Sequence, residues 1–322
     1  MSSAGVLKSL LSKNIITEGQ SQLIGSFLAG RTFSVLNELR IILYGGILLL
    51  TSGLGIIIYE NIDTIGHQVI IGLVALVSAA CFFHACKNRL PFSWSKIKGS
   101  NKLADYSLLL GCVTFLILEG YLQYQYQLFG SKYGFAVIIP TILFFFCAYR
   151  FDHTGVLSMA VTGLASWLGL TIAPLSLLSG NDFTDLKLLV SAIILGICLV
   201  IFGKVSENRD LKKHFAFTYL FLGGNLAAAA ATTGLLSHDF KIIYFLVSAS
   251  LSAYFVMQAR GNQSALFLLM GVIYGYIVFS YSLFKIAPDF VPEIFALWYF
   301  LFSSMGVLWF LLNFKKLLGI KK

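Results

Sequence analysis

Charged residues are scarce in this chain: Asp, Glu, Lys and Arg make up only 11% of its 322 residues, against roughly 25% in an ordinary soluble domain. This shortage excludes a typical water-soluble surface. Hydrophobic residues make up 58%, and apolar runs of about 20 residues recur along the chain, which is the length that a helix needs to cross a bilayer. A transmembrane barrel would instead show alternating segments of about ten residues. We therefore predict an all-α fold, a polytopic bundle of transmembrane helices.

Cysteine and histidine are equally scarce, with five of each. The histidines lie at span ends or in loops without the spaced partners that metal or triad chemistry needs, and no glycine-rich phosphate loop carries a lysine. We expect no metal, no cofactor and no enzyme activity, although a lipid-modifying enzyme or acyltransferase could be built from scattered residues. No cysteine pair has zinc-site spacing, and we interpret all five as small buried apolar residues: Cys81, Cys86, Cys112, Cys147 and Cys198.

Ten membrane spans are expected. The N-terminus has no continuous apolar core of signal-peptide type, so the first span itself is expected to direct insertion. We divide the chain into an N-terminal cytoplasmic helical segment (1–38), a transmembrane domain (39–314) and a basic cytoplasmic tail (315–322). The predicted spans cover residues 41–59, 67–86, 106–125, 133–149, 154–174, 186–203, 215–236, 242–258, 263–284 and 293–313.

The Lys and Arg distribution predicts the orientation. With the N-terminus inside, the internal segments hold 19 Lys and Arg residues and the external loops hold four; such an excess marks the cytoplasmic side. Several acids, among them Asp63, Asp182 and Asp289, fall outside. The net charge of +9 is therefore a topology signal, and no nucleic-acid partner is needed to explain it. Both termini are expected in the cytoplasm.

The N-terminal segment 13–31 is typical of a turn followed by a short amphipathic helix, with Thr17 as its N-cap. Ile24, Phe27 and Leu28 would share one face of this helix. We interpret it as a cytoplasmic cap at the membrane surface; the alternative is a regulatory or partner-binding domain.

An internal repeat is indicated by an offset of about 110 residues. Basic loop 87–104 aligns with 204–213, external Lys132 with Lys241, and internal Arg150 with Arg260. The tripeptide Ile-Ala-Pro recurs at 172–174 and 286–288. The repeat unit would be spans two to five and spans six to nine. Because each copy holds an even number of helices, the copies would run parallel; chance alignment of apolar sequence is the alternative.

A resemblance to a known family rests on the turn "NIITEGQ", the glycine-rich first span "LYGGILLLTSGLGIIIYENID" and the segment "LFGSKYGFAVIIPTILFFFCAYRF". In this order they resemble the bacterial predicted membrane proteins catalogued as domain of unknown function 2157, over about the first half of the chain. Where that family commonly has an Asn-Trp-Asp-like triplet, this chain has Asn61, Ile62 and Asp63, without the aromatic. The resemblance implies a bacterial inner-membrane protein of unassigned biochemistry.

The stretch "LEGYLQYQYQLF" (118–129) places polar side chains at the outer end of the third span. On a helix Glu119, Gln123, Tyr126 and Gln127 fall within one arc, whereas the other tyrosines of the stretch are typical of an interfacial belt. An acid at membrane depth is costly and usually faces protein or water. We therefore expect the Glu119 carboxyl group to face the bundle, with a hydrogen-bonding partner from another span.

Two later spans carry further candidates for a substrate path. Residues 223–234 are rich in glycine and alanine, which favours tight helix packing, and Asn225 is the polar member of this stretch. Span nine contributes Tyr274, Tyr281 and Ser282 on roughly one side, where they line either the core or a cavity. The substrate-path candidates are Glu119, Gln123, Tyr126, Asn225 and Tyr274.

Two functions remain open from the sequence. The first is a transporter or flippase-like carrier of a small polar or amphipathic substrate, because carriers share many spans, duplicated architecture and intramembrane acids. The second is a scaffold or sensor subunit of an envelope complex, favoured by the near absence of charge pairs within the spans. The expected partners are the lipid bilayer, envelope proteins and a small-molecule substrate that the sequence does not identify.

Overall fold

The computed structural model describes residues 10–11, 16–29, 36–97, 101–130, 132–172, 183–285 and 293–318, and all regular structure in these ranges is helical. The chain divides into two compact units: Met1–Leu50 with Lys321–Lys322, and Thr51–Ile320. The Ala-Pro pairs of the repeated tripeptide, Asp182 and Asp289 lie outside the described residues, as does the end of the basic tail.

The first unit contains α2 (Glu18–Ala29) and the start of α3 (Leu36–Ile65). The hydroxyl of Thr17 accepts a hydrogen bond from the backbone N–H of Gln20, and the Gln20 side chain accepts one from the N–H of Thr17. This reciprocal pair is a capping box, which satisfies two backbone donors at the helix start. The predicted N-cap is therefore confirmed.

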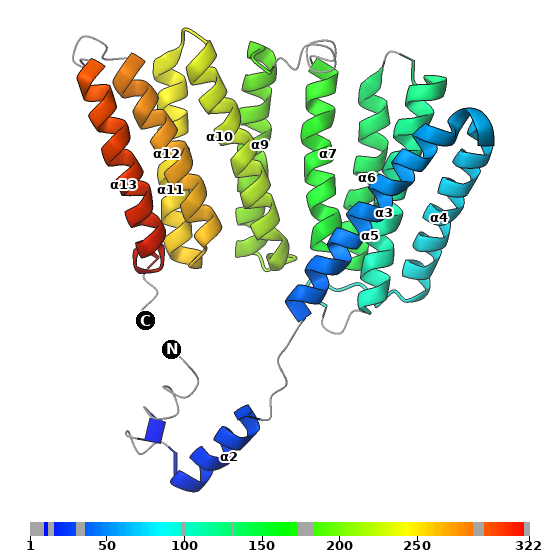
Figure 1. Ribbon diagram of the computed structural model, residues 1–322, viewed down its shortest axis with the longest axis horizontal. Coiled ribbons are helices and arrows are strands. Elements are labelled where there is room, and N and C mark those ends of the chain that lie inside the picture. The colour runs from blue at the N-terminus through cyan, green and yellow to red at the C-terminus, as the bar shows by residue number, and fades with distance from the viewer. Residues whose placement is uncertain are drawn as a thin grey trace. The chain divides into compact units, whose positions relative to one another are not determined.

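The second unit is a row of long helices that stand side by side (Figure 1). They are α4 (His67–Lys87), α5 (Lys102–Tyr126), α6 (Tyr133–Phe151), α7 (Thr154–Ile172), α9 (Leu186–Asn208), α10 (Ala216–Ser237, preceded by the short 3-10 helix η1, Lys213–Phe215), α11 (Lys241–Asn262), α12 (Ala265–Lys285) and α13 (Glu293–Leu317).

Eight of the described helices, α4 to α7 and α9 to α12, are long and apolar enough to cross a membrane. Each begins and ends within five residues of a predicted span, which confirms the helical membrane bundle. The first predicted span coincides with α3, whose apolar stretch, Ile41–Ile57, is shorter than those of the eight helices. The tenth coincides with the 25-residue α13. Crossing of the bilayer by these two helices stays a prediction.

The helix contacts follow the same pattern in two groups of four. In α4–α7 the first helix contacts the second, the third contacts the fourth, and the second contacts both the third and the fourth. In α9–α12 the same four contacts recur, and α7 joins the groups by contacting α9 and α10. This is the neighbour pattern that a parallel four-helix repeat requires.

The turns that join the third and fourth helices of each group are also alike. Asp152 ends α6 and Gln263 ends α11, both with left-handed backbone at φ of 59° and 49°. In each turn the N–H groups of this residue and of the next donate to the carbonyl of a fully buried alanine, Ala148 or Ala259. The two alanines are 111 residues apart, which agrees with the offset found in the sequence.

Helices α9 and α10 approach most closely at two glycines. A Cβ atom added to Gly196 would lie 2.5 Å from the carbonyl oxygen of Gly223 and 2.7 Å from the backbone nitrogen of Ala227. No side chain fits at that distance, so the small residues predicted to favour tight packing do pack tightly here. Five alanines of α10 are almost fully buried along the same helix: Ala216, Ala227, Ala228, Ala230 and Ala231.

The interpretation of the cysteines needs a correction. All five are free; Cys112 and Cys147 are buried and Cys81 is half-buried, but Cys86 and Cys198 are exposed. The last two lie on bilayer-spanning helices, where an apolar side chain can face lipid as well as core. Hydrophobicity alone could not distinguish these two surroundings.

Candidate functional site

Glu119 lies on the buried side of α5 with only 6% of its surface exposed. Its Oε2 atom is buried and has no hydrogen-bond partner among the described residues. The inward orientation expected from the sequence is therefore present, but the partner expected from another span is missing for this oxygen. A buried carboxyl oxygen left unsatisfied costs free energy, so packing alone does not account for an acid at this position.

The surroundings of Glu119 follow from the antiparallel pairing of α5 with α6. The thiols of Cys112 and Cys147 meet across these helices. Because both helices rise by 1.5 Å per residue, residue 119 lies level with residue 140 of α6. That residue is Pro140, which is buried inside the helix, and a proline leaves the carbonyl four residues earlier without its helical donor. Pro140 therefore lies at about the same depth along the bundle as the unpartnered acid.

Gln123 is buried on the same face, one turn beyond Glu119. Its side-chain oxygen accepts a hydrogen bond of 2.9 Å from the N–H of Phe129, and its Nε2 donates to the carbonyl of Gly130 at 2.9 Å. Both partners belong to the loop that follows α5, so Gln123 fixes this loop on the end of its own helix. Tyr126 is 47% exposed at the end of α5.

Asn225 and Tyr274 meet in the second group of helices. The Tyr274 hydroxyl donates to Asn225 Oδ1 at 3.2 Å, from α12 to α10, and Asn225 Nδ2 donates to the Phe221 carbonyl at 2.9 Å. Three further buried polar atoms, Ser248 Oγ, Tyr254 OH and Gln258 Nε2, have no partner among the described residues, and all three belong to α11. Of the candidates, the structure brings only Asn225 and Tyr274 into contact, whereas Glu119 and Gln123 share one buried face of α5.

A charged cluster joins the two helix groups at the end of the bundle where three predicted cytoplasmic loops meet. Lys212 is fully buried and its Nζ lies 2.6 Å from Oδ1 of Asp152, which is itself 5% exposed. His214 Nε2 donates to the same oxygen at 2.8 Å, and the N–H of Ile97 donates to Oδ2 at 2.9 Å. The Lys212 N–H donates to the Trp94 carbonyl, so the loops 88–97, 152–153 and 209–215 are held together.

The electrostatics of this cluster favour an ionised Asp152. Burial by itself would raise the pKa of this carboxyl group, but the hydrogen bonds from Lys212 and Ile97 and the nearby charges outweigh it and lower the pKa. Nearby, burial lowers the pKa of His153, against the opposing attraction of the Asp105 carboxylate. The neutral ring of His153 accepts a hydrogen bond from the N–H of Val156 through Nδ1 at 3.1 Å, and so caps the start of α7.

Sequence reasoning missed the Asp152–Lys212–His214 cluster because its residues lie in short loops, where no periodicity shows which side chains meet. One signal was present: Asp152 is an acid in a turn between two predicted spans, on the side that holds 19 Lys and Arg residues. An acid among so many bases is a candidate ion-pair partner, but its partner 60 residues away could not be chosen from the sequence.

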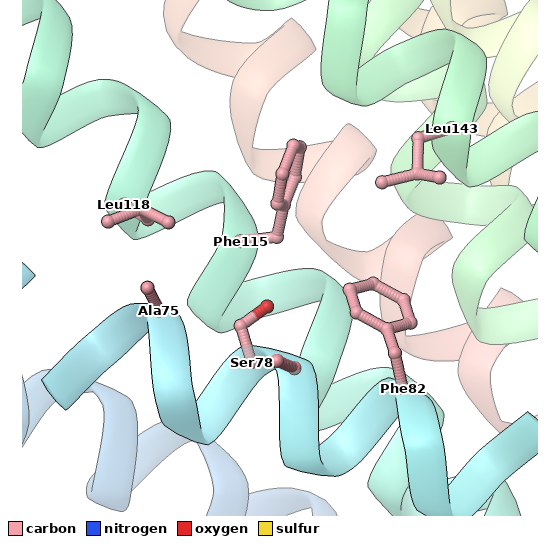
Figure 2. A pocket seen from close by; sticks show the side chains of 7 residues that line it. Ala75, Ser78, Phe82, Phe115, Leu118 and Leu143 are labelled. Carbon is pink, nitrogen blue, oxygen red and sulfur yellow. The ribbon is translucent and has the colours of Figure 1, made fainter. Parts of the chain in front are cut away.

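A groove of about 340 Å³ lies between α4, α5 and α6. Its lining is shown in Figure 2: Ala75, Ser78, Ala79 and Phe82 of α4, Phe115 and Leu118 of α5, and Leu143 of α6. Ser78 is the one polar side chain in this lining, and its hydroxyl donates to the Gly111 carbonyl at 3.2 Å. The groove is therefore apolar, and it does not include Glu119.

Residues 8–157 match the family described as "Predicted membrane protein (DUF2157)". This confirms the resemblance inferred from the sequence, from the N-terminal segment through α6 and into the first residues of α7. No curated protein and no solved structure matches the chain.

Proposed function

We propose that the protein is a carrier of the bacterial cytoplasmic membrane, with both termini in the cytoplasm, that moves a small polar or amphipathic substrate together with a proton bound at Glu119. The observation that carries this proposal is the buried Oε2 of Glu119, which lacks a partner among the described residues. An acid within a membrane span usually pairs with another group or marks a substrate or proton pathway. A proton or substrate group that binds and leaves would account for the unpartnered oxygen.

Two further features support a carrier. The repeated contact pattern of α4–α7 and α9–α12 is the kind of duplicated architecture on which many carriers rest, with substrate sites at or near the junction of the copies. Pro140 removes one backbone hydrogen bond from the continuous helix α6 at about the depth of Glu119, and a carbonyl freed in this way can accept a hydrogen bond from a substrate. The proposal includes no enzyme activity and no cofactor.

The test uses purified protein in liposomes. Counterflow of a pooled set of labelled amino acids, sugars and nucleosides, and scrambling of a fluorescent phospholipid, would be measured against protein-free liposomes. We expect one substrate class to equilibrate only in the presence of protein. The Glu207→Gln variant controls for the loss of a carboxylate away from Glu119. It should transport normally, because Glu207 is a partly exposed carboxylate paired with Lys204. Absence of protein-dependent movement for every class would contradict the proposal.

The scaffold function remains the second candidate, favoured by two observations. The close contact of Gly196 with Gly223 and the buried Asp152–Lys212 ion pair hold neighbouring helices in fixed positions, whereas carriers must rearrange them. A scaffold would bind envelope proteins and would move no solute. Crosslinking of the protein in intact cells, followed by identification of stoichiometric partners, would favour this function if the liposome assays stay negative.

A further inference from the structure

We propose that the groove between α4, α5 and α6 holds an acyl chain of an anionic phospholipid, whose phosphate lies between Arg89 and Arg150. This lipid site goes beyond the proposed carrier function and does not depend on it. The groove is formed by helices long and apolar enough to span a membrane. Its one polar side chain, Ser78, already donates its hydrogen bond to Gly111, so its occupant should be apolar at this depth.

The shape of the groove suits a single chain. Ala75, Ser78 and Ala79 are small residues of α4 and form the floor of the groove. Figure 2 shows Ala75 and Ser78 on α4 with Phe82, Phe115 and Leu143 around them. The rings of Phe82 and Phe115 meet edge to face, with centroids 6.5 Å apart. Ala79 is exposed and Phe115 is half-buried, so the floor and wall are open to an occupant from the bilayer.

Both walls of the groove lead to an arginine at the same end. Arg89 lies two residues beyond the end of α4 and seven residues after Phe82, and Arg150 follows Leu143 by seven residues on α6. Seven residues are almost two helical turns, so Arg150 lies nearly on the same face of α6 as Leu143 and about 10 Å further along the axis. The N–H of Arg89 donates to the Cys86 carbonyl, which continues the turn of α4 to this residue.

The Arg150 side chain reaches the backbone next to Arg89. Arg150 Nη1 donates to the carbonyl of Leu90 at 3.0 Å, which places its guanidinium group beside the residue that follows Arg89. Neither arginine forms an ion pair within the part of the chain that the structure describes. A guanidinium group has five donors, and paired arginines at a membrane surface are suited to bind a phosphate.

The dimensions fit one leaflet. Ala75 and Lys87, the last residue of α4, are 12 residues apart, about 18 Å along the helix axis, whereas half of the hydrocarbon core is about 15 Å thick. A lipid with its chain beside Ala75 and Phe82 would therefore place its phosphate at the membrane surface, at the level of the arginines. The positive charge of the two arginines, the distance from the groove to the membrane surface and the apolar lining all favour an anionic phospholipid as the occupant.

The test compares lipid binding by native mass spectrometry of the detergent-purified protein, with phosphatidylglycerol and phosphatidylcholine as probes. We expect phosphatidylglycerol to bind at least about tenfold more tightly. Arg89→Gln with Arg150→Gln should reduce its affinity about tenfold or more, since a charge-assisted hydrogen bond contributes roughly one such factor, and should leave phosphatidylcholine unchanged. Arg260→Gln, at the equivalent end of α11, is the charge control.

The groove is tested by Ala79→Leu, which fills it. This variant should reduce binding of both lipids about tenfold, whereas Ala80→Leu, an exposed neighbour outside the groove lining, should not. A thermal melt checks that each variant is folded. Equal affinity for the two lipids, or equal losses in the Ala79 and Ala80 variants, would overturn the proposal. So would a dimer that disappears with Ala79→Leu, because a second copy of the chain would then be the occupant.

Discussion

Replacing Lys212 by methionine should destabilise the protein by about 3–5 kcal/mol, the usual cost of removing one partner from a buried ion pair. Lys212 is 0% exposed, and Asp152, its partner at 2.6 Å, is 5% exposed. Methionine keeps most of the apolar stem but removes the ammonium group. The Asp152 carboxylate would then stay buried with two remaining donors, His214 and the N–H of Ile97.

Other contacts of Lys212 add a smaller amount. Its ammonium group lies 5.1 Å from the centroid of the Phe92 ring and 5.7 Å from that of Phe215, and such contacts contribute about 0.5–2 kcal/mol each. The matched control is Lys213→Met. Lys213 is 64% exposed and lies 3.7 Å from Asp210, which is 81% exposed, so this change should shift stability by less than about 1 kcal/mol.

The assay is denaturation of the purified protein in mixed micelles, followed by tryptophan fluorescence. A second measurement separates an unpaired charge from lost packing: adding Asp152→Asn to the Lys212 variant removes the buried carboxylate and should restore part of the lost stability. If Lys212→Met costs no more than Lys213→Met, the cluster does not hold the helix groups together. The low pKa of Asp152 means that its contribution is present above about pH 4 and is lost below it.

Three further predictions concern the turns, the packing and the orientation. Because the pKa of His153 is low in the folded protein, the unfolded chain takes up a proton first as the pH falls, and stability should decrease below about pH 6.5. His153→Asn can still cap α7 and should make the melting temperature depend less on pH. An unchanged pH dependence in this variant would contradict the prediction. Gly196→Ala should cost about 1–3 kcal/mol by overpacking, measured by denaturation, whereas Gly261→Ala, which meets nothing within 4 Å, should be neutral or stabilising; equal effects would refute the close helix contact. In a variant without native cysteines, a cysteine at exposed Lys213 should react with an impermeant thiol reagent only in inverted vesicles and one at exposed Asp239 only in intact cells, and the reverse pattern would invert the map.

Helix positions could be predicted from the sequence because an apolar run must be long enough to cross the hydrocarbon core of the bilayer. The structure begins α4 at His67, α6 at Tyr133 and α7 at Thr154, each as expected, and ends them within two residues of the predicted ends. Among α4 to α12 the larger differences lie at the ends toward the predicted cytoplasmic side, where α9 continues to Asn208; α3 also continues six residues past the predicted outer end of the first span, to Ile65. Polar residues can extend a helix beyond the hydrocarbon core, and hydropathy gives no sign of it.

The candidate site could be predicted from the sequence only in part. Helical spacing correctly placed Glu119 and Gln123 on one buried face, since both are 6% exposed. It could not show that Gln123 would bind its own following loop, because loop geometry has no periodic signal. Nor could it pair Asn225 with Tyr274, whose contact depends on the crossing of α10 and α12. Cross-helix partners depend on rotation and register, which composition does not determine.

The measurement that tests the central claim most directly is substrate accumulation driven by a pH gradient in liposomes containing the Glu119→Gln variant. The amide keeps the shape of the side chain but cannot exchange a proton. The account predicts that the variant folds normally, still exchanges substrate across the membrane without a gradient, and no longer accumulates it when a gradient is imposed, whereas wild-type protein and Glu207→Gln do both. Full gradient-driven accumulation by the Glu119→Gln variant would contradict the claim that this carboxyl group carries the proton.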